Sequence, residues 1–290
     1  MTQALDVVSS SLREQVEYLL VCPRCQSRLD ATDAEVRCRS VACGFVGALA
    51  NDVVLLGDRS RLSFFDDKHQ VMAAGNEREG AQCICYERQS TLVESFLQPG
   101  MVVLDVGCGP TLPYQKPADS FVIGLEASYE SIVVNDDVDM RIYGTAAELP
   151  FADRSLDAVL AFYAVHHMTG QNRAENRETV VQVFREFGRV IKPGGELLVF
   201  EVSPWPPFAL VEKAIWNTAR GILGRKLDMF FYSRRAYEAL GRATLPEARL
   251  SIEPFQTPLT TTFPPVFSLP WFQLPRAMYP MDAILYRWRF

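Results

Sequence analysis

The fold of this chain is predicted most directly by the stretch "VVLDVGCGPTLPYQKP", Val102 to Pro117. Its first half is a short, β-rich apolar run that ends at Asp105 and continues into Gly107 and Gly109, as a nucleotide-binding loop begins after a strand. Its second half departs from a dinucleotide-binding loop. No third glycine follows at the spacing of a dinucleotide-binding loop, and prolines obstruct the helix whose amides would hold a pyrophosphate. The expected ligand therefore needs the glycine turn but no phosphate-binding helix.

Further runs of strand length follow this stretch. They are "FVIGLE", "MRIYG", "LDAVLAF", "ELLVFEV", "RLSIEPF" and "AILYRWRF". The first five of the seven runs are separated by helix-sized or turn-rich connections, which is typical of a parallel sheet covered on both faces. The last two alternate and predict an antiparallel pair at one edge. We therefore expect an α/β fold with a seven-stranded, Rossmann-like, mostly parallel sheet.

Ligands of such sheets bind at the carboxyl ends of the strands. The first strand ends at Asp105 and its glycine turn, and the second ends at Glu126, which is about the spacing at which a carboxylate meets the two hydroxyls of a ribose. S-adenosylmethionine carries an adenosine and a ribose but no phosphate. It is therefore the ligand that the opening stretch predicts.

Four segments together resemble the successive motifs of class I S-adenosylmethionine-dependent methyltransferases of the type 11-like group. They are "VVLDVGCGP", "VIGLEAS", "AELPFADRSLDAVLAFYAVHHM" and "REFGRVIKPGGELLVFE". The likeness extends over roughly 100 residues in the right order. It implies that the protein is an enzyme that transfers a methyl group from this cofactor.

The resemblance also implies residue roles. Asp105, Gly107 and Gly109 would form the turn around the methionine part of the cofactor, with Asp105 orienting its ammonium, and Glu126 would bind the ribose. The remaining cofactor residues are Thr145, Ala146 and Ala161. The family commonly has an acid at the position of Thr145, so that residue or the backbone of Ala146 would replace the usual contact to adenine. Ala161 lies on the fourth strand, whose end would face the transferred methyl.

Two adjacent histidines, His166 and His167, come just after the fourth strand. An imidazole titrates near neutral pH and could remove a proton from an acceptor hydroxyl or amine. Tyr163 is a further possible contact to the acceptor. The alternative is that these side chains only shape the pocket, because methyl transfer from a sulfonium often needs little beyond alignment.

The N-terminal part has the spacing Cys22-x2-Cys25-x12-Cys38-x4-Cys43. Four thiolates spaced in this way predict a tetrahedral zinc site, which would be structural because it leaves no position for water or substrate. The alternative is four unrelated cysteines. The segment resembles the zinc-ribbon modules ahead of some methyltransferases, although its second pair has four intervening residues where two are usual.

The chain has 290 residues and a net charge of −6, and its length suggests about two domains. We expect a zinc-ribbon-like module over 1–60, a linker and helix over 61–90, and a methyltransferase domain over 91–290.

No apolar run approaches the roughly 18 residues of a membrane span, and residues 1–8 do not resemble a signal peptide, so we expect a cytoplasmic protein. Cys83 and Cys85 are spaced poorly for sharing one metal ion, so we expect small buried residues, with redox chemistry or substrate contact as the alternatives.

The last part of the chain differs from the rest. Residues 205–290 carry 11 Lys/Arg against 6 Asp/Glu and hold all four tryptophans. We expect segments of about 205–245 and 257–282 to form a helical and aromatic lid that aligns the acceptor and excludes water. Its proposed pocket walls are Trp205, Trp216, Phe267, Trp271 and Phe272. The alternatives are packing of these aromatics onto the core and docking on a membrane surface.

Three functions are then open. The first is methyl transfer to a small, lipophilic or aromatic acceptor. The second is methylation of RNA, because some ribosomal RNA methyltransferases place a zinc finger before this core. Residues 1–60 carry 6 Lys/Arg against 8 Asp/Glu, which argues against RNA binding, whereas the basic tail favours it. The third is a noncatalytic cofactor-binding protein. Oligomeric state cannot be predicted from the sequence.

Overall fold

The computed structural model describes residues 11–57, 83–224, 227–255, 262–263, 274–275, 278 and 281–290. Its helices are α2 (Leu12–Leu19), α5 (Cys83–Phe96), α6 (Tyr129–Ile132), α7 (Arg173–Val190), α8 (Pro206–Leu223) and α9 (Arg234–Thr244). A 3-10 turn, η2, covers Val165–His167. Within these ranges no helix combines the length and the apolar character that a bilayer crossing requires.

All seven expected strands form, and they lie in one sheet. They are β5 (Val102–Val106), β6 (Phe121–Glu126), β7 (Met140–Tyr143), β8 (Leu156–Phe162), β9 (Ile191–Pro204), β10 (Arg249–Phe255) and β13 (Met281–Arg289). The expected total of seven is wrong, because this sheet has eleven strands in the order β1-β2-β3-β4-β7-β6-β5-β8-β9-β13-β10. The four extra strands are β1 (Leu29–Ala31), β2 (Glu35–Cys38), β3 (Val46–Ala50) and β4 (Val53–Leu55).

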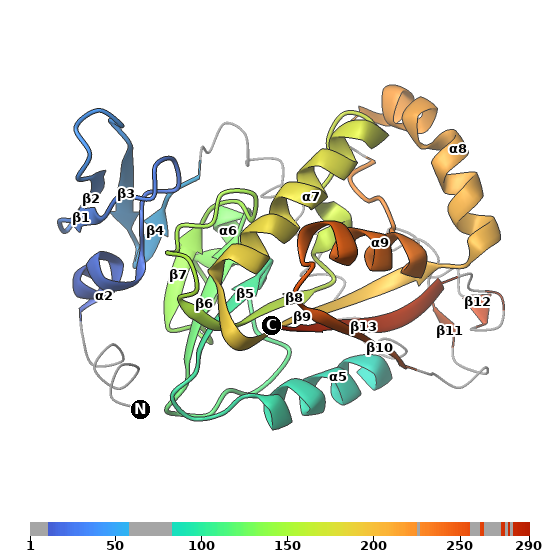
Figure 1. Ribbon diagram of the computed structural model, residues 1–290, viewed down its shortest axis with the longest axis horizontal. Helices are drawn as coiled ribbons and strands as arrows, with labels where there is room; N and C mark the ends of the chain where they lie inside the picture. Colours follow the sequence, from blue (N-terminus) through green and yellow to red (C-terminus); the bar gives the residue numbers. More distant parts are fainter. Residues whose placement is uncertain are drawn as a thin grey trace.

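The extra strands come from the cysteine-rich segment, which continues the sheet. β4 pairs in parallel with β7, and both Leu56 N–H and Gly57 N–H donate to the carbonyl of Tyr143. A second connection joins Val21 N–H to the carbonyl of Pro150 at 2.9 Å. The segment is thus hydrogen-bonded to the parallel sheet along one edge, as Figure 1 shows in blue beside β7.

The central strands are buried on both faces. β5 "VVLDV" is buried at every position, which is why the sequence reads there as a continuous apolar run. α2, α7 and α9 contribute to the core on one face, and α5 and α6 to the core on the other. Figure 1 shows α7 and α9 on the side of β8 and β9 opposite to α5. Parallel strands therefore end together at one edge, where the functional residues were expected.

The other edge of the sheet is antiparallel, as expected. β13 lies between β9 and β10 and pairs with both in antiparallel register. β9 is longer than expected because it includes "KPGG", Lys192 to Gly195, as an irregularity in its register with β8. Gly194 has a φ of 83°, a left-handed conformation that glycine adopts without steric cost.

The first expected lid segment contains α8 and α9. Trp216 is buried in α8, and its Nε1–H donates to the carbonyl of Met229 at 3.0 Å, while Trp205 at the start of α8 donates to Asp282. In the second segment, the described short strands β11 (Thr262–Phe263) and β12 (Leu274–Pro275) pair with one another. The other three aromatic residues of the expected lid, Phe267, Trp271 and Phe272, lie outside the described residues, as do the side chains of Cys83 and Cys85.

Candidate functional site

The glycine turn after β5 touches the segment after β8. Gly107 has a φ of 71° and Gly109 a φ of 62°, both in the left-handed region. A Cβ on Gly107 would lie 2.6 Å from the Cβ of Ala164, so only glycine fits there without a shift of the neighbouring chain. The two segments that were expected to flank the donor and the acceptor are therefore in direct contact.

Glu126 closes β6 beside this turn. One carboxylate oxygen accepts from Gly109 N–H at 3.0 Å, and the other accepts from Ala127 N–H at 2.7 Å and Ser128 N–H at 2.9 Å. These backbone donors fix the carboxylate in place, yet the residue stays half-buried. Glu126 is thus held at the rim of the site with part of its surface open to a ligand.

Asp105 lies deeper and has an unpaired oxygen. Its exposed fraction is 1%, and Oδ2 accepts from the hydroxyl of Tyr114 at 2.7 Å. Oδ1 is buried and has no hydrogen-bond partner. Burial, with a smaller contribution from the charge of Glu126, raises the pKa of Asp105 to about 7. A buried acceptor without a donor is costly, so a cationic donor is the partner that this oxygen suits.

The third strand end adjoins Glu126. Gly144 N–H donates to the carbonyl of Glu126 at 3.0 Å, which brings the turn after β7 beside the end of β6. In that turn Thr145 is half-buried, with Oγ1 accepting from Ala147 N–H, and Ala146 is buried. Both residues expected near adenine therefore lie next to the residue expected to bind the ribose.

Ala161 is part of the core. Its side chain has an exposed fraction of 0%, and the residue pairs with Val106 of β5 and Val199 of β9. The following residues are more open, since Phe162 and Tyr163 are half-buried. Any contact from the end of β8 to a ligand would come from these residues rather than from the methyl group of Ala161.

Tyr163 has an unusual backbone and a partner that the sequence did not indicate. Its φ is 50°, which is uncommon for a bulky residue and stores strain. Its hydroxyl accepts from Nε2 of Gln89 in α5 at 2.7 Å. Gln89 has an exposed fraction of 0%, and its Oε1 is buried without a partner. No spacing in the sequence relates a helix residue to a tyrosine 74 positions later.

The two histidines differ in their surroundings. His166 Nδ1 lies 2.8 Å from Oε2 of Glu201, a residue of β9 with an exposed fraction of 0%. His167 Nδ1 is buried without a hydrogen bond, 3.6 Å from a carboxylate oxygen of Asp228. Burial and the neighbouring His166 lower the pKa of His167. Glu201 and Asp228 were not identified from the sequence, because their pairing with η2 depends on the fold.

The four cysteines of the N-terminal segment converge. Their sulfur atoms all lie within 4.8 Å of one another, with Cys22 and Cys43 at 3.7 Å and Cys25 and Cys38 at 3.4 Å. Zinc–sulfur bonds of about 2.3 Å in a tetrahedron separate the sulfurs by about 3.8 Å. The cluster therefore has the donor set and spacing of a four-thiolate zinc site. Cys43, in the irregularly spaced second pair, is part of it.

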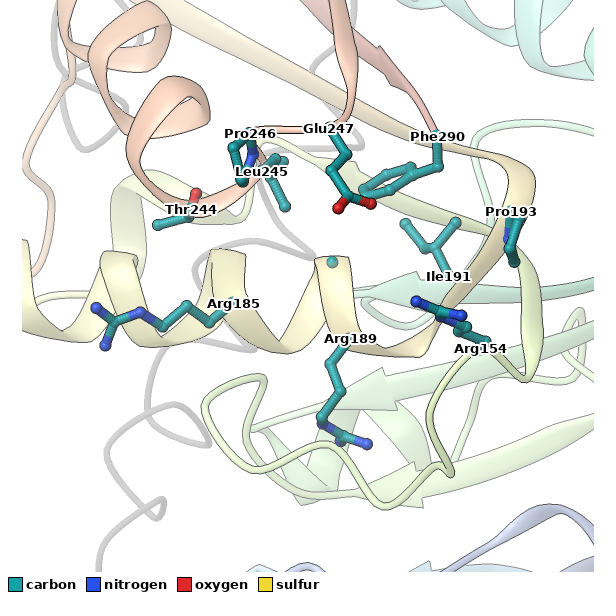
Figure 2. A pocket seen from close by; sticks show the side chains of 11 residues that line it. Arg154, Arg185, Arg189, Ile191, Pro193, Thr244, Leu245, Pro246, Glu247 and Phe290 are labelled. Carbon is teal, nitrogen blue, oxygen red and sulfur yellow. The ribbon is translucent and has the colours of Figure 1, made fainter.

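The cavity in Figure 2 lies away from the predicted cofactor site. Its volume is about 290 Å³, and it is bounded by Arg154 before β8, Ile191 at the start of β9, Leu245 after α9 and Phe290 after β13. It therefore lies at the amino ends of the parallel strands. Figure 2 shows Glu247 and Phe290 facing α7 across it, and Arg185 pointing away from them. It shares no residue with the predicted cofactor site.

Comparison with known proteins supports the interpretation of the parallel sheet. Residues 104–199 match the methyltransferase domain family. The chain is 34% identical to a 27-O-demethylrifamycin SV methyltransferase of Amycolatopsis mediterranei, over 38% of this chain and 42% of that protein. It is 31% identical to a demethylmenaquinone methyltransferase of Corynebacterium glutamicum, over 48% of this chain and 55% of that protein.

The name of a third relative says that it methylates tRNA. The chain is 30% identical to a tRNA (carboxymethyluridine(34)-5-O)-methyltransferase of Arabidopsis thaliana, over 37% of this chain and 26% of that protein. The chain thus spans about half or less of the length of these relatives. The family match begins after the cysteine cluster, so it leaves the likeness of that cluster to zinc ribbons a prediction. Residues 104–199 are thus similar to methyltransferase domains.

Proposed function

We propose that this protein is an S-adenosylmethionine-dependent enzyme that methylates a small, lipophilic or aromatic acceptor. The observation that carries the proposal is the pair of carboxylates at the ends of β5 and β6, one rigidly held at the rim and one buried with an unpaired oxygen. The unpaired Oδ1 of Asp105 suits the ammonium of the cofactor, and Glu126 suits its ribose hydroxyls. Both lie beside the glycine turn of a methyltransferase domain.

The remaining cofactor contacts follow the same edge. Thr145 and the backbone of Ala146 would contact adenine, since their turn is hydrogen-bonded to Glu126. Gly107 and Gly109 would let the methionine part approach the backbone. Ala161 would contribute only through its place in β8. The bound cofactor would supply a methyl group on a sulfonium. Tyr163, His166 and His167 flank Ala164, which touches the same turn, and would face the acceptor.

A small acceptor is favoured by charge and by relatives. Two of the three relatives are named for small organic acceptors, and residues 1–60 carry a net negative charge. RNA methylation is the second candidate function. It is supported by the tRNA methyltransferase relative and by the basic residues of the C-terminal part. A noncatalytic cofactor-binding role is the third. Cytoplasmic location and the lid role of residues 205–245 and 257–282 stay predictions.

We further propose that Cys22, Cys25, Cys38 and Cys43 hold one structural zinc ion. The support is the convergence of four sulfurs from two separate turns at distances that suit one ion. Four thiolate ligands leave no open coordination position, so the ion would stabilise the N-terminal segment and take no part in methyl transfer.

Calorimetric titration with S-adenosylmethionine tests the cofactor site. Glu126→Ala should weaken binding by about 1 to 3 kcal/mol, the scale of hydrogen bonds to a charged group. Asp119→Ala is the matched control, because Asp119 is an exposed carboxylate before the opposite end of β6. Equal affinity of both variants and the unmodified protein would place the cofactor elsewhere.

Transfer of a labelled methyl group into cell extract tests the acceptor class. With a small lipophilic acceptor, the label should enter the organic-soluble fraction and be unaffected by ribonuclease. Loss of labelling after ribonuclease, together with steep weakening by added salt, would favour the RNA alternative. Cofactor binding without any transfer would favour the noncatalytic role.

A further inference from the structure

The ring of His166, in η2, is oriented by a carboxylate from β9. Glu201 in β9 is completely buried, and one of its oxygens accepts from Val165 N–H at 2.8 Å and from His166 N–H at 3.2 Å. Its other oxygen lies 2.8 Å from His166 Nδ1. A carboxylate accepts hydrogen bonds, so this contact places the ring proton on Nδ1. The lone pair of the neutral ring is then on Nε2.

The other ring nitrogen of His166 is available. Among the described residues, none forms a hydrogen bond with Nε2, and Nε2 is not fully buried. It therefore reaches solvent-accessible space, while the rest of the ring packs on Phe231 and His167. An imidazole with one nitrogen fixed by a buried carboxylate and the other open is arranged to accept a proton.

His167 lacks this arrangement. Its Nδ1 is the buried nitrogen without a hydrogen bond, and the nearest carboxylate oxygen, from Asp228, is 3.6 Å away. That distance is too long for a hydrogen bond. Of the two histidines that the sequence could not separate, only His166 has its proton fixed by a partner.

His166 also lies close to the donor side. It is two residues after Ala164, whose Cβ would meet a Cβ on Gly107 at 2.6 Å. The residue that precedes η2, Ala164, is therefore packed on the glycine turn that forms the proposed cofactor site. The same glutamate that orients the ring also holds the start of η2 through the two backbone N–H groups.

We propose that His166 Nε2 receives the proton of the acceptor, and that Glu201 is the positioning residue that makes this possible. The proposal rests on the proposed methyltransferase function. As the acceptor oxygen or nitrogen bonds to the methyl carbon, the carbon–sulfur bond breaks and leaves its electron pair on sulfur. The acceptor proton moves to Nε2, while Nδ1–H remains hydrogen-bonded to Oε2 of Glu201.

Other charged and titratable groups face this pair. His167 packs beside His166, and Asp228 lies 3.6 Å from Nδ1 of His167. Glu212 of α8 is also close enough to interact electrostatically with His166. Burial raises the pKa of Glu212 to about 7. Tyr237 of α9 and Tyr286 of β13 lie near Glu201, which contributes to raising the pKa of each hydroxyl; burial is the main cause. Among the described residues, Glu201 is the hydrogen-bond partner of Nδ1 of His166.

The test is the tautomer of His166 measured by long-range ¹H–¹⁵N nuclear magnetic resonance on the whole protein, with signals assigned through His166→Gln. The unmodified protein should show the neutral ring protonated on Nδ1. Glu201→Gln should shift the ring toward the Nε2-protonated form, because the amide can present a donor to Nδ1. Glu212→Gln is the matched control: it removes a nearby carboxyl group but should leave the tautomer unchanged.

Activity gives the second measurement, with labelled S-adenosylmethionine and a panel of phenols and naphthols as acceptor probes. Glu201→Gln should lower kcat about 100-fold, the scale of lost general-base catalysis, with the cofactor Kd changed less than twofold. An Nε2-protonated His166 in the unmodified protein would overturn the proposal even if Glu201→Gln failed to fold. Unchanged kcat in a folded Glu201→Gln would also overturn it. Absence of cofactor binding by the unmodified protein would instead refute the proposed function.

Discussion

Asp105 illustrates how one buried residue links the fold to a ligand. It is the fourth residue of β5, where a fully buried strand leaves the side chain with a single donor, the hydroxyl of Tyr114. Burial favours the neutral form, which is why its pKa is raised to about 7. A ligand ammonium beside Oδ1 would favour the charged form and lower that pKa again. Cofactor binding should therefore be coupled to the release of a proton.

This coupling gives a prediction with a definite sign. Below pH 7 the free protein holds a proton on Asp105 that the cofactor must displace, so affinity for S-adenosylmethionine should fall as the pH is lowered from about 7 to 5. Titrations at pH 6 in buffers of different ionisation enthalpy should report close to one proton released. Asp105→Asn should bind more weakly and lose this pH dependence. An affinity that is constant over this range would contradict the proposed contact.

The raised pKa of Asp105 also affects the stability of the protein without cofactor. The carboxyl of Asp105 has a higher pKa folded than unfolded, so its contribution to stability is present below about pH 4 and is lost as the pH rises through about 7. Ionising this group in the empty site costs folding free energy, and the cofactor would offset that cost.

At the residue scale, the sequence identified the groups that lie at strand ends. Asp105 and Glu126 follow apolar runs directly, so their place in the sheet was predictable. Gln89 and Glu201 were missed, since one is on a helix and the other on the far part of β9, and only tertiary packing brings them to Tyr163 and His166. Strand periodicity also could not tell that the side chain of Ala161 faces the core.

At the scale of elements, the long buried strands were predictable and the short ones were not. β3 is exposed or half-buried at all five positions, and β1 and β4 have three residues each. Strands of three to five residues are too short to establish a clear period in the sequence, so their place becomes visible only through their pairing with neighbouring strands. The turn between β3 and β4 also depends on Asn51 and Asp52 in the left-handed region, at φ values of 52° and 57°.

The cysteine cluster gives the prediction at this scale. Purified protein should contain one zinc ion per chain, and Cys38→Ser should lose it, because Cys38 ends β2 and is one of four converging thiols. Cys108→Ser is the matched control, since Cys108 is a buried free thiol in the glycine turn, away from the cluster. Elemental analysis that finds zinc retained in Cys38→Ser would contradict the assignment of the site.

At the scale of the whole molecule, residues 1–60, which we expect to form a separate module, share a buried core with the strands of the parallel sheet. Val16, Leu20 and Phe45 belong to the same buried cluster as Leu104 of β5 and Ile142 of β7. The predicted boundary at residue 60 follows from the cysteine spacing and the likeness to zinc ribbons, which do not indicate which side chains pack together. The pairing of β4 with β7 could not be inferred, because a parallel partner 88 residues away leaves no local pattern.

This shared core predicts that the two parts unfold in a single event. The N-terminal segment contributes strands to the common sheet and side chains to the common core, so loosening it exposes apolar surface of β5 and β7 as well. Zinc bound only by the folded state adds to the stability of everything that unfolds with the site. Removal of the metal should therefore lower the melting temperature of the whole molecule.

Calorimetry can measure this directly. The metal-loaded protein should show one unfolding transition, and a strong chelator or Cys38→Ser should move that single transition down by several degrees, about 2 to 4 °C for each kcal/mol lost in a chain of this size. Cys108→Ser treated with chelator should shift like the unmodified protein, because it retains the zinc site. A separate low-temperature transition after metal removal, with the main transition unmoved, would mean that the β4–β7 pairing does not couple the two parts. The N-terminal segment would then be an independent module on the edge of the sheet.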